Sequence, residues 1–323
     1  MILNKSIAGL EISPAFIRAV ELQKGKNKPR FKVAGSIPLP QGAIKDGSIE
    51  QPDVVSGAIK RLWTDSGIKT KDVLLGVNNQ YVIVRIANMP KSKKDQWDKT
   101  IRYQAQEYLP VALTSVELDY MVIEEEVSDN TNQMKVMLVA AGKNMIKEHM
   151  NVIESAGLRI NDIDVSALAL TKMLSSVQKT GTGIVMNLCR DISVLLILSH
   201  GIPILVRNLN VNLSQYSNVD VNDFPENRME ELTELVSKDI ISSLNYYHNN
   251  YPNSNVGSIY LSGMLSDNKN FITHMNDRLE IPTESINPFS VLNADQERID
   301  KLKTPGEYVI TTGLAIRGLE GLR

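Results

Sequence analysis

The chain lacks sequence features typical of disulfide-bonded, membrane-spanning, secreted and nucleic-acid-binding proteins. Its 323 residues include one cysteine, Cys189, so no internal disulfide can form, which fits a reducing compartment. No hydrophobic run approaches the roughly 20 residues of a membrane-spanning helix, and the first residues lack the apolar stretch of a signal peptide. Lys and Arg number 35 against 37 Asp and Glu, so no basic excess exists to neutralise nucleic-acid phosphates. We expect a cytoplasmic protein with no transmembrane segment and no nucleic-acid partner.

Familiar catalytic and metal-binding patterns are also missing. The four histidines, His149, His200, His248 and His274, lie far apart and share no ligand-type spacing with one another or with Cys189. Nothing near the cysteine in the sequence supplies a base to activate it. A lone histidine on a helix flank is more often a surface residue than a ligand. We therefore expect no metal site and no catalytic nucleophile, and we expect surface positions for the histidines.

Short strands and amphipathic helices make up the first half of the chain. Residues 7–37 predict a meander of three strands joined by polar turns. From residue 80 the pattern changes to a compact unit, predicted as β-α-β-β-α, that looks inserted. Its first helix is predicted over residues 93–109, with a capping-box-like start at Ser92. The residues on the apolar face of this helix are Trp97, Ile101, Ala105 and Tyr108.

The opening plan recurs in the second half. After a helix predicted over residues 166–177, residues 184–198 predict a hairpin and residues 204–211 a third strand, in the order seen at the start. A long helix follows from Pro225, with apolar residues spaced to face a core. Two similar halves, each led by a meander, with a module inserted in the first, predict a two-domain chain.

Seven short sequences are informative when taken together: GLEI at 9–12, LPQGAIKDG at 39–47, NMP at 88–90, IRYQAQEYLP at 101–110, LDY at 118–120, ESAGL at 154–158 and GLAIRG at 313–318. They resemble sequences of PilM-type type IV pilus assembly proteins, a branch of the FtsA and actin-like ATPase superfamily. None is specific alone. Their order and spacing over nearly the whole chain carry the resemblance.

The resemblance implies an α/β fold with mixed sheets. It is the actin-like (ribonuclease H-like) two-domain fold with an FtsA/PilM-type inserted subdomain. The implied subdomains are 1A at residues 1–78 and 158–180, 1C (the insert) at 79–157, 2A at 181–208 and 256–323, and a reduced helical 2B at 209–255.

Proteins of this family are cytoplasmic adaptors, so the resemblance implies a role in the pilus assembly platform and in twitching motility. The implied partner is the N-terminal cytoplasmic tail of PilN, a bitopic membrane protein, and pilus motor ATPases are further candidates. The tail would hold the chain at the inner face of the cell membrane, in a groove between the insert and the first half. From the residues alone, the nominated contacts would be ordinary surface and core residues. They are Tyr103, Gln106, Glu107, Tyr108, Leu109, Pro110 and Asp119.

Many proteins of this family also bind ATP between their halves, through glycine-bearing hairpins and acidic residues that hold Mg²⁺. This sequence departs from that pattern. In the first hairpin Ser13 and Pro14 replace the glycine, and proline has no N–H to offer a phosphate. In the second, Asn187 and Cys189 stand where Asp and Gly are expected. Met264 would project toward an adenine ring.

We therefore expect a degenerate cleft, no cofactor and no catalytic residue. If ATP with Mg²⁺ does bind, the residues expected near it are Glu11, Ser13, Arg18, Asn187, Ser193 and Gly263. The alternative to an adaptor is an ATP-binding actin-like switch or weak ATPase that forms filaments. FtsA-like proteins carry a C-terminal amphipathic membrane helix, and we expect none at residues 318–323.

Overall fold

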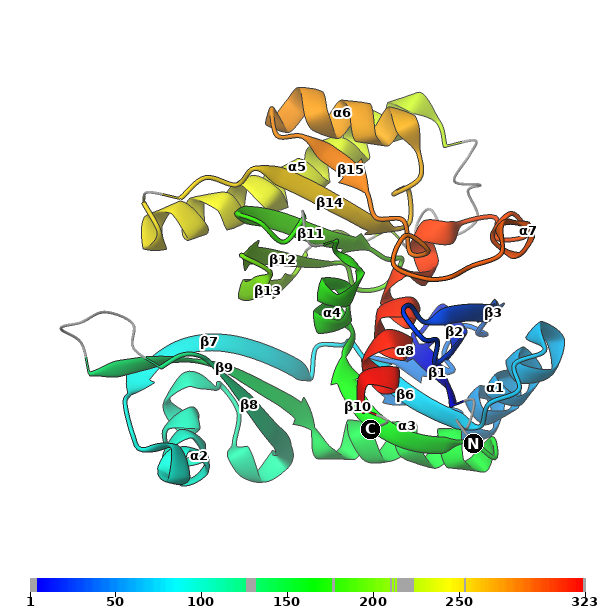
Figure 1. Ribbon diagram of the computed structural model, residues 1–323, viewed down its shortest axis with the longest axis horizontal. Helices are drawn as coiled ribbons and strands as arrows, with labels where there is room; N and C mark the ends of the chain where they lie inside the picture. The colour runs from blue at the N-terminus through cyan, green and yellow to red at the C-terminus, as the bar shows by residue number, and fades with distance from the viewer. Residues whose placement is uncertain are drawn as a thin grey trace.

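The computed structural model describes residues 5–125, 132–175, 178–209, 211, 213, 224–252 and 254–321. Over these residues the chain forms two five-stranded sheets, a three-stranded sheet and a two-stranded ribbon, with helices packed around them (Figure 1). No helix in this part of the chain combines the length and apolar character needed to cross a membrane.

The first five-stranded sheet has the order β10-β6-β1-β2-β3. Its strands are β1 (Ser6–Ile12), β2 (Phe16–Gln23), β3 (Arg30–Pro38), β6 (Asp72–Val77) and β10 (Arg159–Val165). The predicted meander is confirmed, because β1, β2 and β3 pair antiparallel, while β6 and β10 extend the sheet in parallel.

Both faces of the first sheet are covered. Helices α1 (Pro52–Ser66) and α3 (Lys143–Ser155) pack on one face. Helix α8 (Val309–Gly321) packs on the other, where the two halves of the chain share a hydrophobic core. The ribbon formed by β4 (Ile44–Lys45) and β5 (Ser48–Ile49) lies near α3, whose Glu148 accepts a hydrogen bond from the backbone of Ile49.

The second five-stranded sheet, β13-β12-β11-β14-β15, repeats the plan of the first. Its strands are β11 (Thr182–Leu188), β12 (Val194–Ser199), β13 (Ile202–Asn208), β14 (Ser258–Gly263) and β15 (Thr283–Ser285). The first three again form an antiparallel meander, and β14 and β15 add in parallel. This repeat confirms the prediction of two similar halves.

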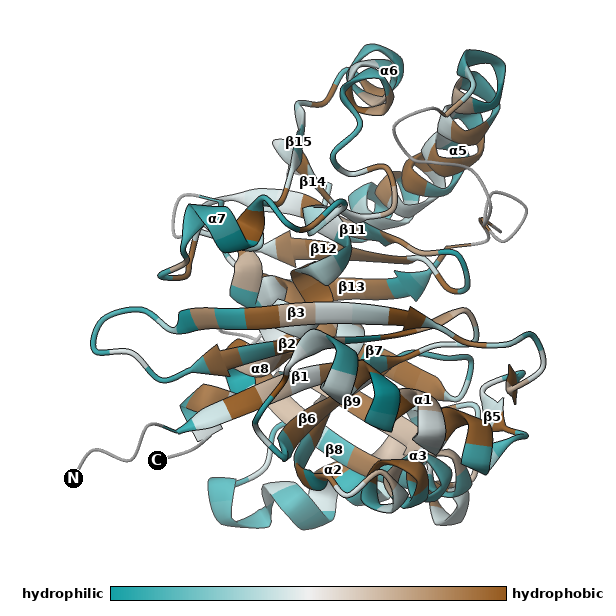
Figure 2. Ribbon diagram, turned by 90° about the vertical axis from the view of Figure 1, so that its right-hand side faces the viewer, coloured by the Kyte–Doolittle hydropathy of each residue, from teal (hydrophilic) through white to brown (hydrophobic). Residues whose placement is uncertain are grey.

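Helices α5 (Glu226–Asn250) and α6 (Lys269–Leu279) cover the outer face of the second sheet. The inner face packs with α8, with α4 (Ser166–Ala169) and with the 3-10 turn η3 (Leu170–Met173). Short α7 (Gln296–Ile299) and η6 (Pro305–Tyr308) precede α8. In Figure 2 strand β12 carries mostly hydrophobic colouring and exposed α7 mostly hydrophilic colouring.

The inserted module has the predicted β-α-β-β-α order. Its elements are β7 (Val82–Pro90), α2 (Trp97–Tyr108), η2 (Leu113–Ser115), β8 (Val116–Glu124), β9 (Gln133–Gly142) and α3. The strands form an antiparallel sheet in the order β7-β9-β8. Helix α2 packs on one face of this sheet, with Ile101 and Ala105 fully buried and Trp97 and Tyr108 beside them.

Two helix predictions need correction. A 3-10 turn, η1 (Lys94–Gln96), precedes α2, so the helix begins at Trp97 and Ser92 caps nothing. The backbone of Ser92 instead accepts a hydrogen bond from the Trp97 indole at 3.1 Å. The helix predicted over residues 166–177 is reduced to α4 and η3, after which the chain is extended at Leu174.

The implied division into subdomains stays a prediction. The sequence also predicts a polar stretch over residues 212–223, of which the structure describes only Leu213, a fully buried residue. Within the segment assigned to subdomain 2B, the described helix is α5.

Candidate functional site

A cavity of about 190 Å³ lies where the hairpins of the two halves meet. The β1–β2 hairpin contributes Glu11 and Ser13, and the β11–β12 hairpin contributes Cys189 and Asp191. His149 from α3 lines it as well. The nucleotide cleft implied by the resemblance would lie at these hairpins.

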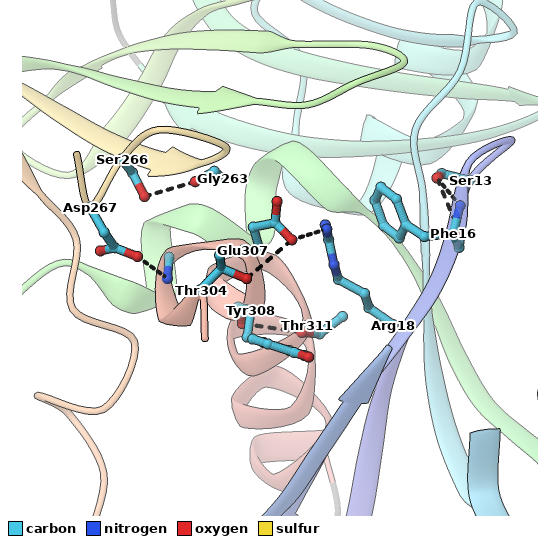
Figure 3. A network of polar contacts seen from close by, with 11 residues as sticks. Ser13, Phe16, Arg18, Gly263, Ser266, Asp267, Thr304, Glu307, Tyr308 and Thr311 are labelled. Atoms are coloured by element: carbon cyan, nitrogen blue, oxygen red, sulfur yellow. Dashed lines mark hydrogen bonds and ion pairs between the residues drawn. The ribbon is translucent and has the colours of Figure 1, made fainter. Parts of the chain in front are cut away.

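The hydroxyl groups of Ser13 and Ser193, two residues expected near ATP if it binds, make hydrogen bonds in the turns of their hairpins. Ser13 Oγ accepts a hydrogen bond from the backbone N–H of Phe16 at 3.3 Å (Figure 3). Ser193 is fully buried, and its Oγ accepts from the N–H of Cys189 at 3.0 Å and donates to the carbonyl of Cys189 at 3.1 Å. Both serines stabilise the hairpins from within.

Asn187 and Gly263 join two strands of the second sheet. The side-chain oxygen of Asn187 accepts a hydrogen bond from Ser262 at 3.0 Å. Gly263 has a φ of +81°, and a Cβ there would lie 2.1 Å from the carbonyl oxygen of Leu188. Glycine is therefore required at this position by the close approach of β14 to β11.

Arg18 is engaged by a residue from the far end of the chain. Its guanidinium lies over the ring of Phe16, 3.6 Å from the centroid, and pairs with the carboxylate of Glu307 in η6. The two charged side chains are only 8% and 12% exposed. Figure 3 shows the pair spanning the space between β2 and the turn that leads into α8.

The space beyond this ion pair is nearly filled. A cavity of about 20 Å³ lies among Gly263, Met264 and Lys303, against the roughly 300 Å³ or more of an ordinary small-molecule site. Asp267 accepts a hydrogen bond from the backbone of Gly306 at 2.9 Å and holds the neighbouring turn. Met264 is 2% exposed and packs into the core of the second half.

Burial controls the charge of the first cavity. It raises the pKa of Glu11 to about 7, against the opposing effect of nearby Arg18. Burial also raises the pKa of Asp191. Hydrogen bonds from Ser13 and Ala15 to this carboxylate offset part of the rise. The pKa of the Cys189 thiol rises to about 12, so thiolate is scarce at neutral pH.

His149 corrects the expectation that all four histidines lie at the surface. It is 4% exposed, and its Nδ1 lies 2.9 Å from the carbonyl oxygen of Met145. Burial lowers its pKa. The residue is enclosed because α3 packs this face against the first sheet. Throughout the described ranges, no three His, Cys, Asp or Glu side chains gather in a way that could hold a metal ion.

A larger cavity, of about 690 Å³, forms a trough between the inserted module and the first half. One wall is the face of the three-stranded sheet opposite α2. Strand alternation places Glu117, Asp119 and Met121 of β8 on this face, opposite Ala141, Val139 and Met137 of β9. We call this cavity the trough from here on.

The other wall of the trough comes from the first half. Along α3, Ile146, Met150 and Glu154 follow one another at intervals of four residues and so share a helix face. Strand β10 and Arg317 of α8 complete the wall. In Figure 1 the three-stranded sheet lies beside β10 and α3.

Two sheet edges border the trough. Strand β8 is the last strand of the order β7-β9-β8, and β10 is the first of β10-β6-β1-β2-β3. Among the strands that the structure describes, each therefore has a neighbour on one side only. Side chains already bond part of these edges: Arg102 donates to the carbonyl of Leu118, and the N–H groups of Tyr120 and Ile163 are bound by Asp119 and Asp162. An extended chain that pairs with either edge would exchange these side-chain bonds for main-chain bonds.

Of the nominated partner contacts, Asp119 lines the trough. The others belong to α2 or follow it, on the opposite face of the sheet. Tyr103 is 83% exposed, whereas Leu109 is buried in the core of the module. Tyr108 Oη donates to the carbonyl of Asn88 at 2.8 Å.

Gln106 makes hydrogen bonds to the loop after α2, at Val111 and Leu113. Glu107 and Pro110 are exposed. The structure thus does not bring these α2 residues together with Asp119. Their role in partner binding stays a prediction.

Sequence reasoning missed most of the trough. Its signals were nevertheless present, as a period of two in Glu117, Asp119 and Met121 and a period of four in Ile146, Met150 and Glu154. Each pattern marks a face of one element. Only the fold reveals that the two faces lie opposite each other.

Comparison with known proteins agrees with this architecture. A family model described as Type IV pilus assembly protein PilM matches residues 9–194. The chain belongs to this family. No protein among the curated sequences matches it.

Solved structures share the fold of this PilM family member at low sequence identity. One is described as the PilM-PilN type IV pilus biogenesis complex; it is 21% identical, has a TM-score of 0.79, and the match covers 97% of this chain and 98% of the other. The ethanolamine utilization protein EutJ from Carboxydothermus hydrogenoformans is 11% identical, with a TM-score of 0.53 and coverage of 97% and 89%. The mixed α/β, actin-like fold class is confirmed.

A third similar structure is the cytoplasmic domain of EpsL, an inner membrane component of the type II secretion system of Vibrio cholerae. It is 9% identical, with a TM-score of 0.50, and the match covers 98% of this chain and 95% of the other.

Proposed function

We propose that the chain is a non-catalytic adaptor of the type IV pilus inner-membrane assembly platform. It binds the N-terminal cytoplasmic tail of a PilN-type bitopic membrane protein. Membership of the PilM family and the likeness to a structure titled as a PilM-PilN complex support this proposal. Through the tail the chain is held at the inner face of the cell membrane, where pilus motor ATPases are further candidate partners.

The tail lies in the trough. The observation that carries this placement is that two strand edges, β8 and β10, border one cavity of about 690 Å³. An extended peptide can add to such an edge through main-chain hydrogen bonds, while its side chains enter pockets on alternate sides. Met150, Met137 and Val139 offer apolar surface to those side chains.

We infer further that the nucleotide cleft is degenerate. The serines of both hairpins make hydrogen bonds within the protein, and the Arg18–Glu307 pair lies between β2 and the turn that leads into α8. A cavity of about 20 Å³ does not admit an adenosine group. These features count against ATP with Mg²⁺ as a ligand, and against a filament-forming switch that depends on it.

A peptide titration tests the adaptor function. A synthetic peptide carrying the N-terminal cytoplasmic tail of the PilN-type protein from the same cell is labelled with a fluorophore and titrated with the full chain. We expect saturable binding at micromolar concentrations. Absence of binding at high micromolar concentrations would overturn the adaptor function.

A further inference from the structure

The trough carries an excess of negative charge. Four exposed carboxylates line it: Glu117, Asp119, Glu154 and Asp162. Asp119 and Asp162 accept hydrogen bonds from the N–H of the next residue, at 2.8 and 2.9 Å. In the described part of the chain, none of these four forms an ion pair with a Lys or Arg side chain.

The cation that lines the trough does not offset this charge. Arg317 is bound to a fifth carboxylate, with its Nε 2.9 Å from Oδ2 of Asp164, whose side chain is only 6% exposed. Lys172, the next cation near Asp164, pairs with Glu320 at 2.6 Å. The four exposed carboxylates therefore remain uncompensated.

This acidity is local. The whole chain has 35 Lys and Arg against 37 Asp and Glu, a formal charge of −2. Elsewhere some carboxylates have a cationic neighbour, as in the pairs of Arg159 with Asp72 and Lys238 with Glu234, and other surface carboxylates stand singly. In the trough four unpaired carboxylates line a single cavity, which gives that cavity a negative electrostatic potential.

Apolar and acidic groups lie side by side on both of its walls. On β8, Glu117 and Asp119 lie beside Ala141 and Val139 of β9, and on α3 the apolar pair Ile146 and Met150 ends at Glu154. An extended chain lying between the walls presents successive side chains in opposite directions, with a period of two. Its side chains on either side would therefore meet apolar surface and carboxylates together.

We propose that the trough selects an extended segment in which Lys or Arg residues accompany apolar residues. This inference rests on the proposed function and names the chemistry of the tail. A cytoplasmic segment next to a membrane span is enriched in Lys and Arg, so such a tail supplies the charge that the trough lacks. Complementary charge fixes the register of the segment and increases the rate of association.

The proposal has a measurable signature. Exposed ion pairs are weakened by salt, whereas apolar contacts are not. Each exposed pair is expected to contribute about two- to fivefold in affinity. Removing two carboxylates should therefore weaken binding by roughly tenfold at low salt, with a smaller loss in about 0.3 M NaCl.

Three forms of the chain are compared with two peptides. The forms are the unchanged chain, the trough variant Glu154→Gln with Asp162→Asn, and a control variant of equal charge, Glu230→Gln with Glu231→Gln. The control residues are exposed on α5, away from the trough. The peptides are the PilN-type tail and a matched form in which every Lys and Arg is replaced by Gln.

We expect the tail to bind the unchanged chain and the control variant equally, and to bind the trough variant roughly tenfold more weakly at low salt. The uncharged peptide should bind all three forms weakly and with little dependence on salt. Charge reversal gives a second readout. Glu154→Lys with Asp162→Lys should restore affinity for a peptide whose basic residues are replaced by Glu.

Several outcomes would overturn the proposal. If both peptides bind the unchanged chain alike, or if the trough and control variants lose affinity equally, charge is not recognised there, although the adaptor function stands. If neither peptide binds, the adaptor function itself fails. If the trough variant instead changes self-association of the chain in sedimentation, the occupant is a second copy and not a basic tail.

Discussion

Glu11 is a carboxylate held out of water beside the hairpins. Because burial raises its pKa to about 7 in the folded chain, the folded state binds a proton that the unfolded state releases above about pH 5. The contribution of Glu11 to the free energy of unfolding should therefore fall as the pH rises from about 5 to 7, and stay level above that range. The total fall is up to about 3 kcal/mol.

Replacing Glu11 with Gln removes this penalty. We expect Glu11→Gln to raise the unfolding free energy at pH 8 relative to the unchanged chain, and to raise it far less at pH 5. Urea denaturation followed by circular dichroism at both pH values measures the difference. A gain of the same size at the two pH values would contradict a raised pKa.

Arg18 and Glu307 hold the two ends of the chain together through a buried ion pair. Glu307→Ala leaves the guanidinium of Arg18 buried without its carboxylate, so we expect a loss of about 3 kcal/mol in unfolding free energy. The matched control is Glu297→Ala, which removes the exposed pair with Lys301 and should cost under about 0.5 kcal/mol. Equal losses would show that the first pair contributes no more than a surface contact.

For Cys189, the sequence predicted the low reactivity but not the burial that contributes to it. The sequence places it in the turn where a phosphate-binding glycine would stand, and the structure finds its N–H bound to Ser193 at 3.0 Å. Its low reactivity was expected because nothing near it in the sequence supplies a base. The burial that raises its pKa depends on contacts between the two halves and is not visible in the sequence.

At the scale of elements, local patterns predicted most of the fold. The polar turns within residues 7–37 predicted β1 to β3, and the apolar face of residues 97–108 predicted the buried side of α2. The start of α2 was placed too early because η1 takes up one turn before it. A capping sequence does not distinguish a 3-10 turn from the first turn of a helix.

The trough depends on contacts between elements far apart in the chain. Glu117 and Glu154 belong to β8 and α3, and each pattern alone indicates only an exposed side chain. The nominated residues on α2 were chosen from the resemblance and from aromatic and polar side chains on the faces predicted to point away from the core of the module. Exposure says nothing about which face of the sheet meets the first half.

Matched substitutions can show which face of the inserted sheet binds the tail. Met150→Lys places a charge in the apolar part of the trough, and Tyr103→Lys makes the same addition at an 83% exposed position on α2. We expect the first to weaken tail binding at least about tenfold, because burying a charge against apolar side chains is costly. The second should leave affinity within about twofold, since its contacts are with solvent.

Fluorescence anisotropy of the labelled tail measures both affinities, and circular dichroism confirms that each variant is folded. A loss with Tyr103→Lys and none with Met150→Lys would move the partner site to α2.

At the scale of the whole molecule, the two halves repeat one plan and share the core around α8. In this arrangement a nucleotide would bridge the hairpins. Here Arg18 and Glu307 make a direct connection instead. We expect titration with ATP and Mg²⁺, followed by calorimetry, to give no binding up to millimolar concentrations. Micromolar affinity would contradict a degenerate cleft.

The central claim is that an extended tail adds to the strand edges of the trough. Hydrogen exchange of the backbone amides, measured by mass spectrometry with and without the tail peptide, tests it most directly. We predict that the peptide slows exchange in β8 (Val116–Glu124), in β10 (Arg159–Val165) or in both, and leaves α2 (Trp97–Tyr108) unchanged. Protection confined to α2, or binding with no protection of either strand, would contradict it.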